Sequence, residues 1–246
     1  MPRALAISPH LDDAAFSAGG TLAALARDGW DVVVVTVFTA SVPHPSGFAL
    51  ACQTDKGLPP EADYMAIRRA EDDAACAALN ARPAHLPLRE APHRGYGSAA
   101  ALFADLRSDD TAHLDAAEAV APLLRDLAPD LLLAPQAIGG HVDHVLTVRA
   151  LQLLNPAAPI LWWADFPYTT RRDTPKRPFA AAMARLPEAS LPTDPAAKRA
   201  ACAAYATQLG YQFGGPDGLS RTLAEAGERE TMRLAGTLPL PVPRAA

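Results

Sequence analysis

Two short clusters of His and Asp side chains each follow directly on an apolar run. The first occupies residues 8–13, Ser-Pro-His-Leu-Asp-Asp, after the apolar run at residues 4–7. If the chain turns into a helix here, His10 and Asp13 face the same point, because residues three apart are neighbours on a helix. Asp12 then projects elsewhere and is free to contact a water molecule. An imidazole and carboxylates of this kind suit a divalent metal with one position open for water.

The second cluster has the same spacing of imidazoles. Residues 140–144, Gly-His-Val-Asp-His, follow the apolar run at residues 130–135. His141 and His144 are again three apart, so one can bind a metal while the other leans over its open position. Asp143 is a candidate to orient a neighbouring imidazole. Together the two clusters predict a metal-dependent hydrolase.

Each cluster also has a purely structural interpretation. Asp12 or Asp13 could cap a helix by accepting backbone N–H bonds, and either short motif can arise by chance. Both motifs, however, begin where a buried strand is expected to end, and two helix caps rarely need three histidines between them. The joint observation favours the metal site.

The pattern of the whole chain predicts elements that bring the two clusters together. Strands are expected at residues 3–8, 32–38, 85–88, 130–135 and 159–164. Helices are expected at residues 17–28, 61–79, 109–127, 142–154 and 195–209, with a further helical stretch at 220–234. Residues 39–60 read as a long loop, and the tail from about 236 to 246 as extended or disordered.

Strands that alternate with helices predict an α/β fold with a doubly wound, mostly parallel, Rossmann-like sheet. We expect a single domain over residues 1–246, with right-handed crossovers. Ligands bind outside the carboxyl ends of the strands in such sheets. Both clusters are expected at that edge.

Composition narrows the functional class. A net charge of −5 without a basic run argues against a nucleic-acid partner. No stretch approaches the ~20 apolar residues of a membrane span, and the N-terminus has no apolar signal-peptide core. The odd, widely separated Cys52, Cys76 and Cys202 suit a reducing cytoplasm. Alanine-rich helices leave a homo-oligomer open.

Three motifs of the chain together resemble those of a known family. Residues 8–13, followed by Ala-Gly-Gly-Thr at 18–21, resemble the first signature of the LmbE-like / PIG-L family of zinc-dependent N-deacetylases. Residues 141–144 are similar to the family's second motif. A third, supporting pattern consists of Arg68, Glu71, Ala75 and Leu79-Asn80. The resemblance spans roughly the first 170 residues.

The resemblance implies three ligands for one Zn²⁺ per chain: His10, Asp13 and His144. The same donors would accept iron, cobalt or manganese. The resemblance further implies that Asp12 is the general base that activates the attacking water. His141 would stabilise the oxyanion and protonate the leaving amine, with Asp143 raising its basicity. Arg68 would contact polar groups of the substrate.

The implied reaction is hydrolysis of an N-acetyl amide on a small glycoconjugate that contains N-acetylglucosamine (GlcNAc), releasing acetate and a free amine. Two alternatives remain: a metal-dependent hydrolase of another amide or ester, and a non-catalytic sugar- or nucleotide-binding α/β module. Loop residues at the expected rim are candidates to hold sugar hydroxyls: Arg94, Tyr96, Trp163, Asp165 and Tyr168.

The sequence departs from the family pattern at two positions. Leu11 stands where a proline is usual, and Gly139 stands where some members carry a tyrosine. Stabilisation of the oxyanion would then rest on the metal and His141, or on a residue from elsewhere.

Overall fold

The structure is a computed structural model that describes residues 1–170 and 175–239. Most of the predicted extended tail, residues 240–246, therefore lies outside the described residues, as do residues 171–174 of the Pro- and Arg-rich segment. Among the described residues, no helix is both long and apolar enough to cross a membrane.

The described strands form one seven-stranded sheet in the order β3-β2-β1-β4-β5-β7-β6. The first five strands in this order are parallel, whereas β7 is antiparallel to both β5 and β6. The strands are β1 (Arg3–Ser8), β2 (Asp31–Thr36), β3 (Arg82–His85), β4 (Leu131–Pro135), β5 (Ile160–Trp163), β6 (Glu188–Ala189) and β7 (Met232–Ala235).

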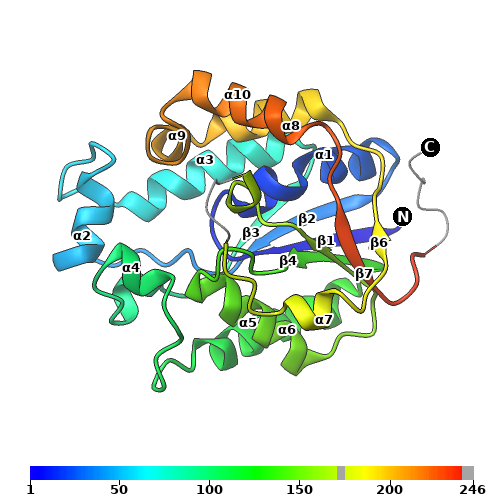
Figure 1. Cartoon of the computed structure of the whole chain (residues 1–246), viewed down its shortest axis with the longest axis horizontal. Helices are drawn as coiled ribbons and strands as arrows, with labels where there is room; N and C mark the ends of the chain where they lie inside the picture. Colours follow the sequence, from blue (N-terminus) through cyan, green and yellow to red (C-terminus); the bar gives the residue numbers. More distant parts are fainter. Residues whose placement is uncertain (171–174, 240–246) are drawn as a thin grey trace.

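Helices cover both faces of this sheet. They are α1 (Asp13–Arg27), α2 (Gly47–Thr54), α3 (Tyr64–Ala78), α4 (Ala99–Leu102), α5 (Ala112–Leu127), α6 (Val142–Leu154), α7 (Ala180–Met183), α8 (Pro195–Ala204), α9 (Ala206–Phe213) and α10 (Pro216–Ala226), with 3₁₀ turns η1 (Ala91–Arg94) and η2 (Tyr168–Thr170). Figure 1 shows α1, α3 and α8–α10 on one side of the sheet and α5–α7 on the other.

The central strands are apolar along their whole length because both of their faces are buried. In β1, Ala4 and Ala6 pack into the core beneath α1, α3 and α8. Leu5 and Ile7 point to the opposite face and pack with α5 and α6. The predicted α/β fold with a mostly parallel sheet is confirmed.

The chain order reverses between β1 and β4, which are adjacent in the sheet although strands β2 and β3 lie between them in sequence. A crevice opens at such a switch point outside the carboxyl ends of the two strands. Both predicted clusters follow these strand ends.

The first predicted helix begins four residues earlier than expected, at Asp13. The Ser8 hydroxyl accepts a hydrogen bond from the Ala14 amide (3.1 Å) and so starts the helix directly after β1. Gly20 consequently lies inside α1 and packs closely. A Cβ atom there would lie 3.0 Å from Cβ of Thr193.

Other predicted elements were wrong in the C-terminal third and in the loops. The helix expected at 195–209 is interrupted at Tyr205, whose hydroxyl donates to Asp72 Oδ1 of α3 (2.6 Å). The stretch expected to be helical at 220–234 ends as strand β7, because its last residues pair with β5. The predicted loop 39–60 contains helix α2, and β3 lies three residues earlier than expected.

Candidate metal centre and active site

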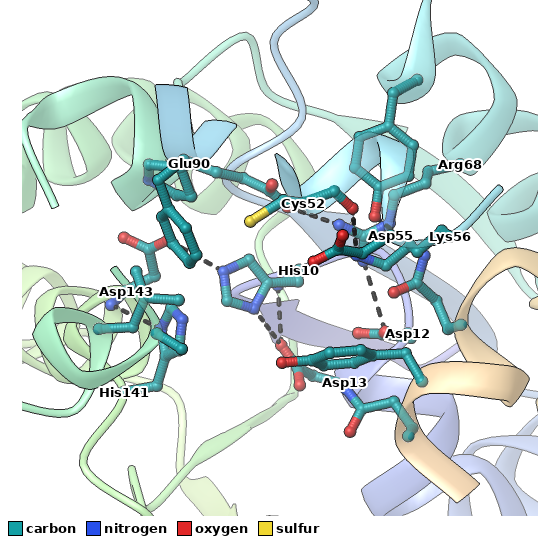
Figure 2. A pocket seen from close by; sticks show the side chains of 18 of the residues that line it. His10, Asp12, Asp13, Cys52, Asp55, Lys56, Arg68, Glu90, His141 and Asp143 are labelled. Carbon is teal, nitrogen blue, oxygen red and sulfur yellow. Dashed lines mark hydrogen bonds and ion pairs between the residues drawn. The ribbon is translucent and has the colours of Figure 1, made fainter. Parts of the chain in front are cut away.

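The two predicted clusters meet at the carboxyl ends of β1 and β4. His10 and Asp12 lie in the turn after β1, and Asp13 opens α1. His141 and His144 lie at the start of α6, after β4. Figure 2 shows His10 in the centre of the site, with Asp143 and His141 on one side and Asp12 and Asp13 on the other.

The three predicted ligands converge on one point. Asp13 Oδ2 lies 3.2 Å from His10 Nδ1 and 3.2 Å from His144 Nε2. Zinc bonds of about 2.0–2.1 Å in a tetrahedral site place neighbouring ligand atoms roughly 3.3 Å apart. His144 Nε2 is buried, and no described residue forms a hydrogen bond with it. An unpaired nitrogen beside a carboxylate oxygen fits a bound cation, and this donor set suits one Zn²⁺.

A carboxylate lies behind each of the two imidazoles that are predicted to be ligands. His10 Nε2 lies 2.9 Å from Asp143 Oδ2, and His144 Nδ1 lies 2.8 Å from Asp165 Oδ1. Because an ionised carboxylate only accepts hydrogen bonds, each ring carries its proton on that outer nitrogen. With a cation bound, each ring would be neutral, and its other nitrogen would present its lone pair toward Asp13 and the metal position.

Asp143 therefore has a different neighbour from the one expected. Its carboxylate accepts hydrogen bonds from the His10 ring, from the Ala91 amide (3.0 Å) and from Arg94 Nη2 (2.5 Å). Burial raises the pKa of Asp143, but the His10 hydrogen bond and the Arg94 charge outweigh it, so the net pKa lies below its usual range. Only the backbone amide of Asp143 reaches the His141 ring.

That backbone contact determines the state of His141. Its Nδ1 accepts the Asp143 amide hydrogen (3.2 Å) and thereby caps α6. A neutral ring must then carry its proton on Nε2. Burial, together with the neighbouring His10 and His144, lowers the pKa of His141 well below its usual value. His141 is thus suited to donate a hydrogen bond as a neutral imidazole.

Asp12 is a buried carboxylate at the wall of a cavity of about 230 Å³. It occupies the cap position of α1, yet its side chain forms no capping hydrogen bond, so the capping interpretation fails for this residue. Burial raises the pKa of Asp12 to about 7, although the charge of Arg68 opposes the shift. A carboxylate tuned in this way is an effective general base near neutral pH.

Arg68 lies beside Asp12 and also lines the cavity. Its guanidinium donates to Glu90 (2.6 Å), to the Leu11 carbonyl (3.0 Å) and more weakly to Asp12 (3.4 Å). Glu90 was not singled out from the sequence, since nothing in its loop marks it. Glu71, from the supporting motif, has a structural role instead: it accepts from the Thr207 amide and hydroxyl (2.7 Å each).

Most of the expected rim residues do not reach the cavity. Asp165, Trp163 and Tyr96 are at most 2% exposed. Internal packing and hydrogen bonds occupy them, as in the bond that Tyr96 accepts from the Arg107 amide. Arg94 is taken up by Asp143 and Asp110. Of the rim candidates, Tyr168 alone lines the cavity.

Tyr168 also explains the glycine at position 139. Gly139 has φ +100°, and a Cβ atom there would lie 2.8 Å from the Tyr168 ring. The ring packs edge-on to His144, with 5.8 Å between centroids. A tyrosine at position 139, as in some family members, cannot coexist with Tyr168 in this arrangement.

Helices α2, α4 and α9 supply the outer wall of the cavity, together with the first residue of α3. The sequence missed this wall because α2 was expected to be a loop and α9 the end of a longer helix. The apolar part of this wall consists of Phe48, Leu102 and Phe103. The part that carries hydroxyl and amide groups consists of Tyr64, Gln208 and Tyr211.

Comparison of the chain with known protein families agrees with this geometry. The PIG-L family, described as GlcNAc-PI de-N-acetylase, matches residues 5–154, more than half of the chain. The chain belongs to the PIG-L family. The matched region contains both clusters and Arg68, so the sequence resemblance is confirmed.

Similar PIG-L relatives include deacetylases. Over 175 residues (70% of this chain), the sequence is 35% identical to 2'-N-acetylparomamine deacetylase from Streptomyces fradiae, and the match spans 59% of that protein's length. A crystal structure of A40926 pseudoaglycone deacetylase Dbv21 has TM-score 0.79 and 31% identity, covering 95% of this chain and 97% of that one. The zinc-inhibited form of teicoplanin deacetylase Orf2 has TM-score 0.76 and 27% identity, covering 94% and 97%.

Proposed function

We propose that the chain is a zinc-dependent N-deacetylase that hydrolyses an N-acetyl amide on a small GlcNAc-containing glycoconjugate, releasing acetate and a free amine. One observation carries the proposal. Asp13 Oδ2 lies 3.2 Å from a nitrogen of each of two histidines, at the wall of a cavity that the separate carboxylate Asp12 also lines. His10, Asp13 and His144 are the proposed ligands.

The relatives support the reaction class and the kind of substrate. One deacetylates an N-acetylated paromamine, and two act in the chemistry of teicoplanin and the A40926 pseudoaglycone, as their names state. All three are named as deacetylases.

Bound zinc would polarise the amide carbonyl and make water a stronger acid. Asp12 is the residue placed to take the proton of the attacking water, since it lines the cavity next to Asp13 without being held by a capping bond. Arg68 holds the Leu11 carbonyl and so fixes the backbone that carries Asp12. The same guanidinium lines the cavity and is available to polar groups of the substrate.

His141 donates from Nε2 to the developing oxyanion, because its Nδ1 is occupied by the α6 amide. A neutral imidazole in this role stabilises charge without transferring a proton. The proton that Asp12 has taken from water is then available to the leaving amine. These roles of Asp12 and His141 differ from those expected from the sequence, in which His141 protonates the amine.

Two alternatives differ from this proposal in testable ways. A hydrolase of another amide or ester would keep the same catalytic groups and differ in its substrate. A non-catalytic sugar- or nucleotide-binding module would need no buried general base. The buried carboxylate of Asp12 beside the proposed metal ligands favours an enzyme.

The test is Asp12→Asn, assayed by amine release from an N-acetylglucosaminyl glycoside. We expect kcat to fall about 10²–10⁴-fold, because general-base catalysis is lost, while the zinc content stays at the wild-type level. Arg233→Lys, far from the cavity at β7, is the matched control. Failure of the zinc-loaded wild type to release amine from any N-acetylated sugar would contradict the proposal.

We also propose that the protein is cytoplasmic. The three cysteines are unpaired, and two of them are buried. Burial raises the pKa of Cys202 to about 12, which keeps its thiol protonated and inert. Sedimentation of the purified chain would establish whether it forms a homo-oligomer.

A further inference from the structure

Asp165 is a buried carboxylate that was predicted from the sequence as a candidate for sugar binding. It follows β5 and is 1% exposed, so it cannot touch a substrate in the cavity. Both of its oxygens are used internally. Oδ1 lies 2.8 Å from His144 Nδ1, and Oδ2 accepts the Ile138 amide hydrogen (2.9 Å).

We propose that Asp165 is a positioning residue for the metal: it fixes the tautomer and the orientation of His144 so that Nε2 is presented as a ligand. The inference rests on the proposed metal site. Asp165, 21 positions after His144, thus has the imidazole-orienting role that was predicted from the sequence only for Asp143.

The geometry around His144 supports this role. With the proton held on Nδ1 by Asp165, Nε2 of the neutral ring is a pure acceptor. That atom is buried, lacks a hydrogen bond within the described part of the chain, and lies 3.2 Å from the acceptor Asp13 Oδ2. Two acceptors this close are stable when a cation lies between them. Asp165 therefore prepares the site for the cation.

The second oxygen of Asp165 fixes the direction of the ring. The Ile138 amide belongs to the loop between β4 and α6, the same loop that carries Gly139 and His141. Asp165 thus joins the end of β5 to the loop and to the ligand in one network. Within residues 1–170 and 175–239, no Lys or Arg forms an ion pair with it, so its charge acts mainly on the imidazole.

Asp165→Asn tests the proposal with almost no change in shape. The new amide can accept from Ile138 and donate to His144 Nδ1, which moves the ring proton to Nε2, the atom needed for the metal. We expect zinc affinity to fall about 10–100-fold, the usual effect of losing such a partner. Competition with a chromogenic chelator measures the affinity without any turnover. The visible spectrum of the cobalt-substituted protein should change as well.

Asp72→Asn is the matched control. Asp72 is also a buried carboxylate, 1% exposed, that contacts a histidine, His85, at 2.9 Å, but it lies between α3 and β3 rather than at the metal centre. The Asp72→Asn substitution should lower the melting temperature and leave the zinc affinity unchanged. A loss of zinc affinity caused only by a loosened core would appear in both variants.

The outcomes separate the inference from the proposed function. If wild type binds zinc and Asp165→Asn binds it within about twofold as tightly, Asp165 has no positioning role. If wild type binds no zinc, the proposed metal site itself fails. Should the variant not fold, imidazole NMR of the zinc-loaded wild type decides: the Nδ1 proton of His144 should be protected from exchange with water, and rapid exchange would overturn the inference.

Discussion

The two histidines proposed as metal ligands each have a buried carboxylate behind them, but the two carboxylates are in different surroundings. Asp143, behind His10, also accepts from Arg94 and from the Ala91 amide. Within the described part of the chain, Asp165, behind His144, accepts beyond the imidazole only from the Ile138 amide. The first carboxylate shares its charge with a guanidinium, whereas the second acts mainly on its histidine.

The pKa values of the two carboxylates follow the same contrast. Burial raises both, but Arg94 and His10 bring the pKa of Asp143 below its usual range. The pKa of Asp165 stays above its usual value, because the His144 hydrogen bond only partly offsets burial. We therefore expect the Asp143–His10 pair to contribute to the stability of the fold. The Asp165–His144 pair should mainly affect the orientation of His144. Variants at the two sites should separate these roles.

The largest expected effect comes from breaking the Asp143 network at its far end. Arg94→Met keeps much of the side-chain volume over Phe38 but leaves the fully buried Asp143 without its cation. We expect unfolding free energy to fall by about 3 kcal/mol, the lower end for a broken buried ion pair, since two other donors remain. Urea denaturation measures the loss. A change under about 0.5 kcal/mol would show that Arg94 does not compensate Asp143.

A direct comparison of Asp143→Asn with Asp165→Asn should give the next largest effect. Asp143 faces three donors, so an asparagine amide must meet one of them, at a cost of about 1–3 kcal/mol. At Asp165 a tautomer change of His144 avoids such a clash. We therefore expect the larger loss of stability at Asp143 and losses of zinc affinity at both sites. Equal stability of the two variants would remove the contrast.

The smallest effect separates capping from catalysis at His141. His141→Ala removes the cap of α6 and should cost about 0.5–2 kcal/mol of stability. His141→Asn keeps a capping oxygen and should retain most of that stability, while both variants lose the proposed donor to the oxyanion. Thermal unfolding and amine release test the two parts separately. Full activity in either variant would exclude the donor role.

The sequence predicted the features that are local in the chain. Each motif follows its own strand, so the meeting of His10, Asp13 and His144 depended only on a parallel sheet with β1 next to β4. Asp165 and Glu90 were not assigned their contacts, because each acts across the fold on a residue from another element. Nothing in the sequence around Asp165 indicates which histidine it reaches.

The wall of the cavity was also missed, for a related reason. At the break between α8 and α9, Tyr205 donates a hydrogen bond to Asp72, a contact between residues 133 positions apart. Helical periodicity continues through Tyr205 and carries no sign of that contact. The end of α10 and the start of β7 likewise depend on pairing with β5.

The most direct test of the account is the zinc content of the purified protein and of His144→Ala, with amine release measured on the same samples. We expect about one zinc per wild-type chain, consistent with a single mononuclear site. The variant should lose both zinc and turnover. A wild type that binds no zinc after reconstitution, or a variant that keeps its zinc, would contradict the proposed metal centre.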